Sequence, residues 1–130
     1  VLVRQFRYAA FAAGQNGWID EIVAGVLDEA DPLQCARREC IEESGYEIDD
    51  FRPIALAFSS PGITTERVHL YTGFCNSKDK KHSGGGLDSE HEDIRIVELS
   101  RKQAWKRLQQ KGFRDGKTIL ALEHFFLNFA

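Results

Sequence analysis

Three glutamates on one predicted helix have the residue type and spacing that could do chemistry. Glu39, Glu42 and Glu43 are spaced i, i+3 and i+4, which places their side chains on one helix face. Like charges at i, i+4 repel each other unless something neutralises them. Arg38 can reach Glu42 across one helical turn, and a hard divalent cation such as Mg²⁺ or Mn²⁺ is the other candidate partner. The spacing by itself leaves a solvated acidic face as the alternative.

The acidic residues of the chain are concentrated around that helix. Between Asp28 and Asp50 there are nine acids and two bases, a net charge of −7, so the remaining residues together carry +4. The whole chain has a formal charge of −3 and a pI near 5.8. Broad nucleic-acid binding needs a basic face, and this distribution therefore argues against it. The pattern favours a cation site or a solvated helix.

The length of 130 residues corresponds to one domain, and 42% apolar with 28% charged residues is typical of a globular protein. No stretch approaches the roughly 20 apolar residues of a membrane helix, and no signal-peptide pattern is present. We therefore expect no membrane association. Three cysteines argue against a disulfide framework and favour a reducing, cytoplasmic setting. The chain has no methionine and begins in VLVRQFR, so we expect it to be a fragment.

The elements that must position these residues are predicted from periodicity, caps and turn residues. Strands are expected at 1–6, 18–24, 54–58, 68–74 and 94–99, and loops at 7–17 and 75–91. Asp31 and Pro32 should begin a helix that Gly45 ends, with further helices at 100–112 and after 117. The order of elements predicts an α+β fold with a mixed sheet covered by helices. Four aromatic residues are interpreted as core rather than as base-stacking platforms: Phe6, Phe11, Trp18 and Phe58.

The stretch from Gly25 to Tyr46 resembles the Nudix box, the signature of the Nudix hydrolases. Arg38 to Tyr46 match every defined position of its second half, whereas Gly25 and Asp31 lie one residue later than the opening glycine and first glutamate of the box. This shortened form, together with VRQFR, SSPGITTE, GGGLDSEHEDI and RDGKT in the same order, is similar to the nucleotide-sugar branch of the family. The resemblance implies a Nudix fold over residues 1–130, a mixed β-sheet sandwiched between α-helices.

The same resemblance implies Mg²⁺-dependent hydrolysis of the pyrophosphate bond of a nucleoside diphosphate sugar. GDP-mannose, cut to GMP and mannose 1-phosphate, is the first candidate substrate, and ADP-ribose or an ADP-sugar is the second. The alternatives of another class are a non-catalytic nucleotide-binding Nudix domain and an acidic interaction module. The branch is homodimeric through an N-terminal β segment, and we expect the chain as given to lack that segment.

The resemblance also assigns metal-binding and catalytic roles. Glu39, Glu43 and the backbone carbonyl of Ala24 would bind metal, and Glu42 would assist a metal or, held by Arg38, orient the other carboxylates. A further loop acid would bind metal or act as a base. Glu92 matches it through its Glu-Asp-Ile trio, with Glu90 as the alternative.

Substrate contacts are expected at the edges of this centre. By resemblance, Arg7 would contact the diphosphate, Glu66 the substrate, and Lys117 the sugar phosphate. Glu21 lies at a strand end before Ala24, where it could orient substrate or water. Arg7, Glu66 and Lys117 could each instead be a surface salt-bridge partner.

Overall fold

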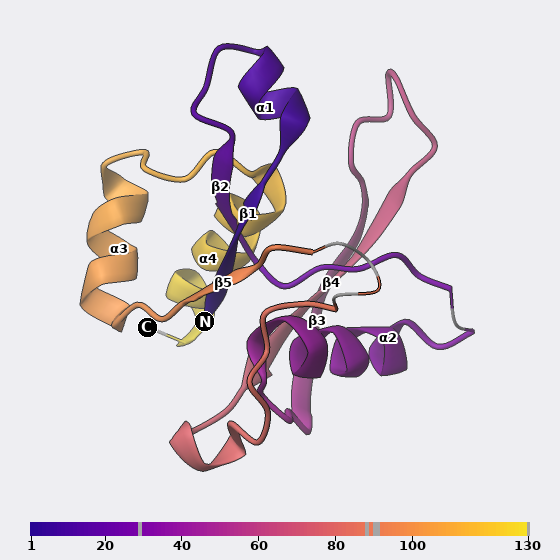
Figure 1. Cartoon of the computed structure of the whole chain (residues 1–130), viewed down its shortest axis with the longest axis vertical. Helices are drawn as coiled ribbons and strands as arrows, with labels where there is room; N and C mark the ends of the chain where they lie inside the picture. Colours follow the sequence, from indigo (N-terminus) through magenta and orange to yellow (C-terminus); the bar gives the residue numbers. More distant parts are fainter. Residues whose placement is uncertain (29, 88, 90–91, 130) are drawn as a thin grey trace.

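The computed structural model describes residues 1–28, 30–87, 89 and 92–129, and it confirms the α+β class (Figure 1). The elements run in this order: β1 (Leu2–Phe6), α1 (Tyr8–Ala12), β2 (Trp18–Glu21), α2 (Pro32–Glu39), the π-helical turn η1 (Cys40–Ser44), β3 (Asp50–Phe58), β4 (Arg67–Phe74), the 3₁₀ turn η2 (Ser77–Asp79), β5 (Arg95–Val97), α3 (Arg101–Gln109) and α4 (Gly116–Phe129).

The strands form two sheets. In the first, β1 is central and pairs antiparallel with β2 and β5, so that Arg4 lies opposite both Asp20 and Arg95. In the second, β3 and β4 pair antiparallel, with a register shift just after Pro53, which has no N–H to donate. Every strand pairing among the described residues is thus antiparallel, which corrects the expectation of one mixed sheet. The short connections from β1 to β2 and from β3 to β4 favour antiparallel pairing, since parallel strands need a long crossover.

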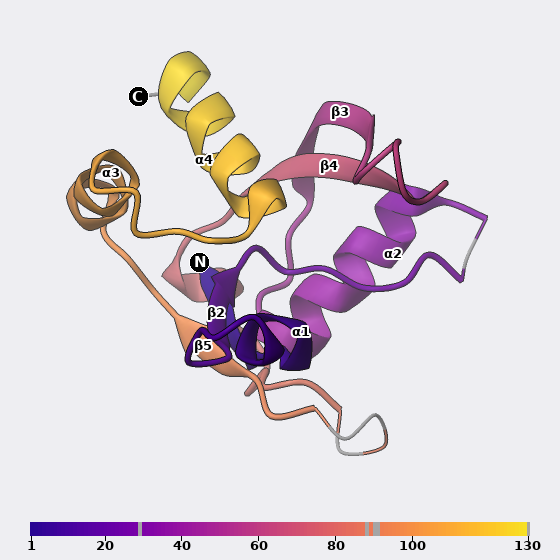
Figure 2. The same cartoon turned by 90° about the horizontal axis from the view of Figure 1, so that it is seen from above.

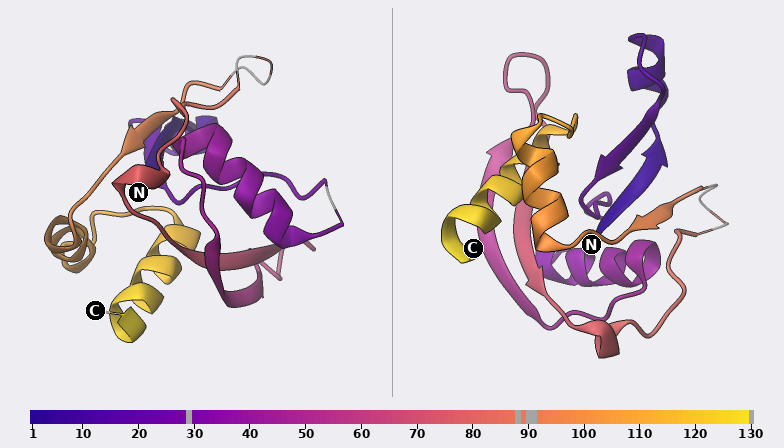
Figure 3. Two further views of the ribbon diagram at one scale, coloured as in Figure 1. Left: turned by 90° about the horizontal axis from the view of Figure 1, so that it is seen from below. Right: turned by 90° about the vertical axis from the view of Figure 1, so that its left-hand side faces the viewer.

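Helices fill the space around the two sheets. Figures 2 and 3 show α2 running between the sheets, while α4 lies between α3 and the β3–β4 sheet. The buried core cluster consists of Leu2, Leu108 and Phe113, which join β1 to α3 and the segment after it. Residues from the end of β2, from β5 and from α4 pack against it, so the core ties the three-stranded sheet to the C-terminal helices.

The helix that carries the three glutamates begins and ends where the sequence predicts. Asp31 accepts a hydrogen bond from the N–H of Leu33, and Pro32 occupies the first helical position. Gly45 ends the helix with φ of +78°, the left-handed conformation that glycine adopts readily. The last turn differs from the prediction because Cys40–Ser44 is π-helical, a widening that often accompanies functional sites.

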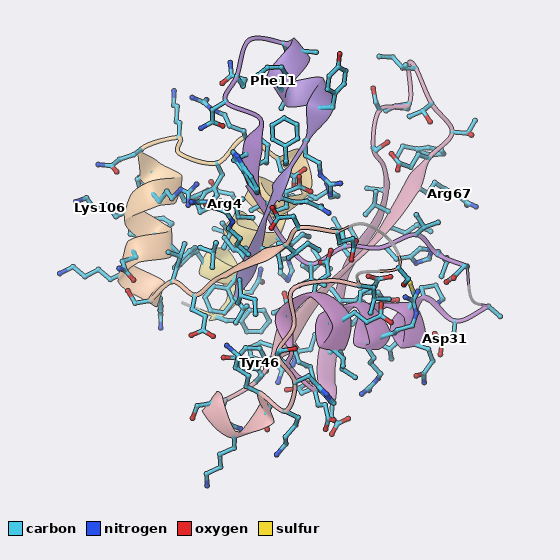
Figure 4. All side chains as sticks on the ribbon, viewed as in Figure 1. Arg4, Phe11, Asp31, Tyr46, Arg67 and Lys106 are labelled. Carbon is cyan, nitrogen blue, oxygen red and sulfur yellow. The ribbon has the colours of Figure 1, made fainter. Side chains whose placement is uncertain are left out.

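Two sequence predictions are wrong, one for the segment at 7–17 and one for three aromatic residues. The segment expected as a loop contains α1, since its alanines favour a helical turn. Phe6, Phe11 and Phe58 are 43%, 53% and 55% exposed, so they are not core residues. Phe6 contacts both Phe11 and Trp18 in a small cluster beside α1, and Figure 4 shows Phe11 at that end of the molecule.

In the part of the chain that the structure describes, no helix combines the length and apolar character needed to cross a bilayer.

Candidate active site

A cleft of about 1330 Å³ is lined by residues of both sheets, α2 and the beginning of α4. The segment that follows β2 also lines it. Seven of the residues singled out in the sequence contribute to its lining, although they are spread over more than a hundred positions: Arg7, Ala24, Arg38, Glu39, Glu66, Glu92 and Lys117. The fold therefore brings these seven residues to one cleft, whereas Glu21, Glu42 and Glu43 are not part of its lining.

Glu43 is the most deeply buried of the three helix glutamates, with 2% of its surface exposed. Its Oε2 accepts a hydrogen bond from the N–H of Ala24 at 3.1 Å. Burial raises the pKa of Glu43 to about 8, the negative charges of Glu39 and Glu92 add to this, and the bond from Ala24 acts in the opposite direction. Three carboxylates from η1, α2 and a distant loop are thus within electrostatic reach of one another.

Arg38 joins the other two glutamates of the helix. Its Nη1 lies 2.9 Å from Glu42 Oε2 and 2.9 Å from Glu39 Oε1, and its Nη2 lies 3.0 Å from Asp28 Oδ1. Burial raises the pKa of Glu39, an effect that Arg38 reduces and the neighbouring acids increase. The repulsion expected from the i, i+4 spacing is therefore partly relieved by an arginine on the same helix.

The carboxylate oxygens of Glu39 and Glu92 in this cleft, and of Glu43 beside it, are ligands of the type and charge that a hard divalent cation prefers. Gly25 is the clearest steric sign, because a Cβ at this position would collide with the Glu39 carboxylate. The missing side chain lets that carboxylate lie against the backbone next to Ala24, whose N–H contacts Glu43. Over residues 1–28, 30–87, 89 and 92–129, no three His, Cys, Asp or Glu side chains already stand in a metal-coordinating arrangement. Arg38 and the Ala24 N–H occupy the carboxylates of Glu39 and Glu43 instead.

The glycine run explains how Glu92 reaches the helix. Gly84, Gly85 and Gly86 all have positive φ, between +65° and +101°. This backbone allows the N–H of Gly85 to donate to Glu43 O at 2.8 Å and the N–H of Gly86 to donate to Glu42 O at 3.0 Å. Glu92 Oε2 in turn accepts from the Leu87 N–H at 3.1 Å. The loop is thereby tied to η1, which brings Glu92 beside the helix acids. Glu90, the alternative loop acid, lies outside the described residues.

Two cations, Arg7 and Lys117, also line this cleft. Arg7 makes a bidentate pair with Glu21, with Nε–Oε1 at 2.8 Å and Nη2–Oε2 at 3.0 Å. Lys117 lies 3.8 Å from Glu21 Oε2 and donates to Asp115 Oδ1 at 2.7 Å. Glu21 is buried, so its carboxylate holds these cations rather than facing the cleft. Arg7 and Lys117 remain half-exposed in side chain, at 45% and 31%.

Glu66 lies apart from the buried cluster. It is exposed at the beginning of β4, next to Arg67, which Figure 4 labels on the protruding β3–β4 hairpin. It lines the same cleft, so a ligand that extends from the carboxylates towards the hairpin would meet it.

Sequence reasoning missed several residues that support the site. Buried Asp20 is held by Arg4, at 2.6 and 3.0 Å, and by Arg107 from α3. Asp115 and Thr118 at the beginning of α4 hold Lys117 and the end of β2. The Asp-Gly-Lys-Thr sequence is a helix-start signature that could have shown Asp115 as a cap, but nothing local shows the partners of Asp20.

The chain is similar to proteins of one known family. Residues 1–121 match the family described as NUDIX domain. The chain is 39% identical over 125 residues to the GDP-mannose pyrophosphatases of Escherichia coli O1:K1 / APEC, Escherichia coli O139:H28 (strain E24377A / ETEC) and Shigella flexneri serotype 5b (strain 8401). These matches cover 95% of this chain and 64% of each relative. The chain therefore belongs to the Nudix family, and it spans about 64% of the length of the curated relatives it matches.

Proposed function

We propose that this chain hydrolyses the pyrophosphate bond of a nucleoside diphosphate sugar in the presence of Mg²⁺. GDP-mannose, giving GMP and mannose 1-phosphate, is the proposed substrate because the relatives cited above carry the name GDP-mannose pyrophosphatase. The observation that carries the proposal is the buried carboxylate of Glu43. It lies within electrostatic reach of Glu39 and Glu92, which line a cleft that Arg7 and Lys117 also line.

Glu39, Glu43, Glu92 and the backbone carbonyl of Ala24 would hold the Mg²⁺, and Mn²⁺ would be an alternative. A divalent metal bound there supplies charge neutralisation on the diphosphate, polarisation of phosphorus and a lower pKa for a bound water. Glu42, paired with Arg38, keeps the helix carboxylates in place. Glu92 reaches the same centre from a loop, where it can accept the proton of the attacking water.

Arg7 and Lys117 are the proposed phosphate-binding cations. The guanidinium of Arg7 is oriented by its two bonds to Glu21, and its fork matches the geometry of phosphate oxygens. Glu66 would contact the end of the substrate that extends towards the β3–β4 hairpin. Glu90 is proposed as a further substrate contact on the loop that carries Glu92.

A panel of nucleotide sugars tests this function. GDP-mannose, ADP-ribose and an ADP-hexose are incubated with the wild type, Glu43→Gln and the matched control Glu123→Gln, with Mg²⁺ or with EDTA. Glu123 is an exposed acid on α4 outside the cleft lining. We expect release of nucleoside monophosphate by the wild type and Glu123→Gln, only with Mg²⁺, and loss of turnover in Glu43→Gln. Turnover by a folded Glu43→Gln at near wild-type rate would contradict the metal assignment. Faster turnover of ADP-ribose than of GDP-mannose would make ADP-ribose the proposed substrate instead.

The same assay separates the two loop acids. Glu92→Gln should slow turnover far more than Glu90→Gln, because the structure brings Glu92 within electrostatic reach of Glu43. The reverse order would exchange their roles.

We also propose a homodimer in the cytoplasm. Large apolar side chains on the surface support an interface, for example Ile63 at 91% and Leu127 at 81% exposed. Three free thiols support a reducing compartment. Sedimentation velocity measures the oligomeric state, and a single monomeric species at micromolar concentration would contradict the dimer.

A further inference from the structure

Thr118, in the first turn of α4, is fully buried, and its hydroxyl makes two hydrogen bonds. It donates to Asp115 Oδ2 at 2.7 Å and accepts from the N–H of Ile22 at 2.8 Å. A hydroxyl has a single proton, so donation to Asp115 leaves a lone pair for the Ile22 N–H. Thr118 thereby fixes a main-chain position 96 residues earlier in the sequence.

Ile22 lies between the two halves of the proposed site. The residue before it, Glu21, orients Arg7 through two hydrogen bonds. Two residues after it, Ala24 donates its N–H to Glu43. Because these contacts are on one extended segment, a shift of Ile22 would displace the phosphate-binding side and the metal-binding side together.

The same helical turn also holds the second cation. Asp115 Oδ1 accepts from Lys117 Nζ at 2.7 Å, while Oδ2 accepts from the N–H and hydroxyl of Thr118. Burial favours the neutral form of Asp115, but the bonds from Lys117 and Thr118 outweigh it and hold its pKa below the usual value. The carboxylate is therefore ionised at neutral pH and orients both side chains.

We propose that Thr118 is a positioning residue that fixes the segment from Glu21 to Ala24, which orients Arg7 and contacts Glu43, relative to Lys117 on α4. It does not itself touch substrate or metal, and the proposal rests on the proposed function. Without its hydroxyl, the Ile22 N–H loses its partner, and the segment loses a hydrogen bond to α4 while the Glu21–Lys117 contact at 3.8 Å remains. Loss of a partner that orients metal ligands typically costs about 10–100-fold in metal affinity or activity.

Three substitutions separate the hydroxyl from the methyl group of this side chain. Thr118→Ser keeps the hydroxyl, Thr118→Val keeps the shape, and Thr118→Ala removes both. The readouts are Mn²⁺ affinity by electron paramagnetic resonance, binding of inorganic pyrophosphate with Mg²⁺ by calorimetry, and Tm. We expect Thr118→Ser to bind both ligands within about twofold of the wild type and the other two variants to bind at least about tenfold more weakly.

Ser100→Ala is the matched control, since Ser100 is a hydroxyl cap at the beginning of α3 and lies outside the cleft lining. It should lower Tm without changing the affinity for Mn²⁺ or pyrophosphate. That result would show that losing a hydroxyl at the beginning of a helix does not by itself weaken binding. A packing role for Thr118 predicts the opposite ranking, with Thr118→Val near the wild type and Thr118→Ser impaired, and would overturn the proposal. Equal binding by all Thr118 variants would overturn it as well.

If Thr118→Val does not fold, the comparison of Thr118→Ser with Thr118→Ala decides, because only the hydroxyl role predicts a difference of about tenfold between them. Wild-type protein that binds neither Mn²⁺ nor pyrophosphate would contradict the proposed function, and this inference would fall with it. If the wild type binds both Mn²⁺ and pyrophosphate and Thr118→Val binds them equally well, the role of Thr118 is contradicted but the proposed function is not.

Discussion

Replacement of Glu43 by glutamine should abolish turnover and, at the same time, stabilise the metal-free protein at alkaline pH. Glutamine keeps the size of the side chain and can still accept the hydrogen bond from the Ala24 N–H, but it cannot ionise. A glutamate whose charge is paired with a cation in the fold would show the opposite effect on stability, because glutamine would leave that cation unpaired.

The magnitude follows from the pKa of Glu43. Its folded-state pKa is about 8 against a usual value of 4.5, because burial and the charges of Glu39 and Glu92 disfavour the carboxylate. Between these two pH values the folded protein holds a proton that the unfolded chain has released. The free energy of unfolding therefore falls as pH rises through this range. At 1.36 kcal/mol per pKa unit, the loss by pH 8 is on the order of 3–5 kcal/mol.

Urea unfolding in EDTA at pH 5, 6, 7 and 8 measures this loss. We expect the wild type to lose stability across the series relative to Glu43→Gln, so that the variant is the more stable protein at pH 8. Mg²⁺ should restore stability to the wild type at pH 8 and have little effect on the variant, because a ligand stabilises only the state that binds it.

Glu123→Gln is the control, since it makes the same chemical change on an exposed acid. Its pH dependence should match the wild type. Parallel pH profiles for the wild type and Glu43→Gln would refute the reasoning, as would a Glu43→Gln variant less stable than the wild type at pH 8 in EDTA.

Three further predictions concern the surroundings of the cleft. Arg7→Lys should raise KM for the nucleotide sugar about tenfold in steady-state kinetics, since lysine cannot replace a bidentate guanidinium; an unchanged KM would contradict the phosphate contact. Asp20→Asn should lower the free energy of unfolding in urea by about 3 kcal/mol, because two arginines lose a buried carboxylate. Asp50 pairs with Arg52 on the surface, so Asp50→Asn should lower the free energy of unfolding by less than about 1 kcal/mol. Equal losses in Asp20→Asn and Asp50→Asn would contradict a special role for Asp20. Ser100→Ala should cost about 1 kcal/mol in the same assay with kcat and KM unchanged, and altered kinetics would show that α3 influences the site.

Local features of the sequence predicted the helix of the site well. Asp31 with Pro32 and Gly45 mark its two ends, and the helix predicted from residue 100 begins with a capping box of Ser100 and Gln103. These signals depend on residues within a few positions of each other, which is why the sequence contains them.

Features that depend on tertiary structure could not be predicted in the same way. The π-helical turn at Cys40–Ser44 is accompanied by hydrogen bonds from the distant glycine run to the carbonyls of Glu42 and Glu43. The sequence predicts that Glu21 orients substrate or water, and only the fold shows that its buried carboxylate pairs with Arg7. The register of β1 and β2 sets such partnerships, and sequence spacing does not reveal it.

The separation of the strands into two sheets was missed for a related reason. Strand periodicity at 54–58 and 68–74 predicts that β3 and β4 exist, and both are present. The pairing partner of each strand depends on packing around α2 and α4. The alternation of side chains along a strand carries no information about that packing.

The most direct test of the central claim is ³¹P NMR of GDP-mannose incubated with this chain. With Mg²⁺ we predict that the two diphosphate resonances disappear and that two monophosphate resonances appear in equal amounts, those of GMP and mannose 1-phosphate. EDTA should prevent the change. Persistence of the diphosphate resonances with folded protein and Mg²⁺, or release of inorganic pyrophosphate, would contradict the account.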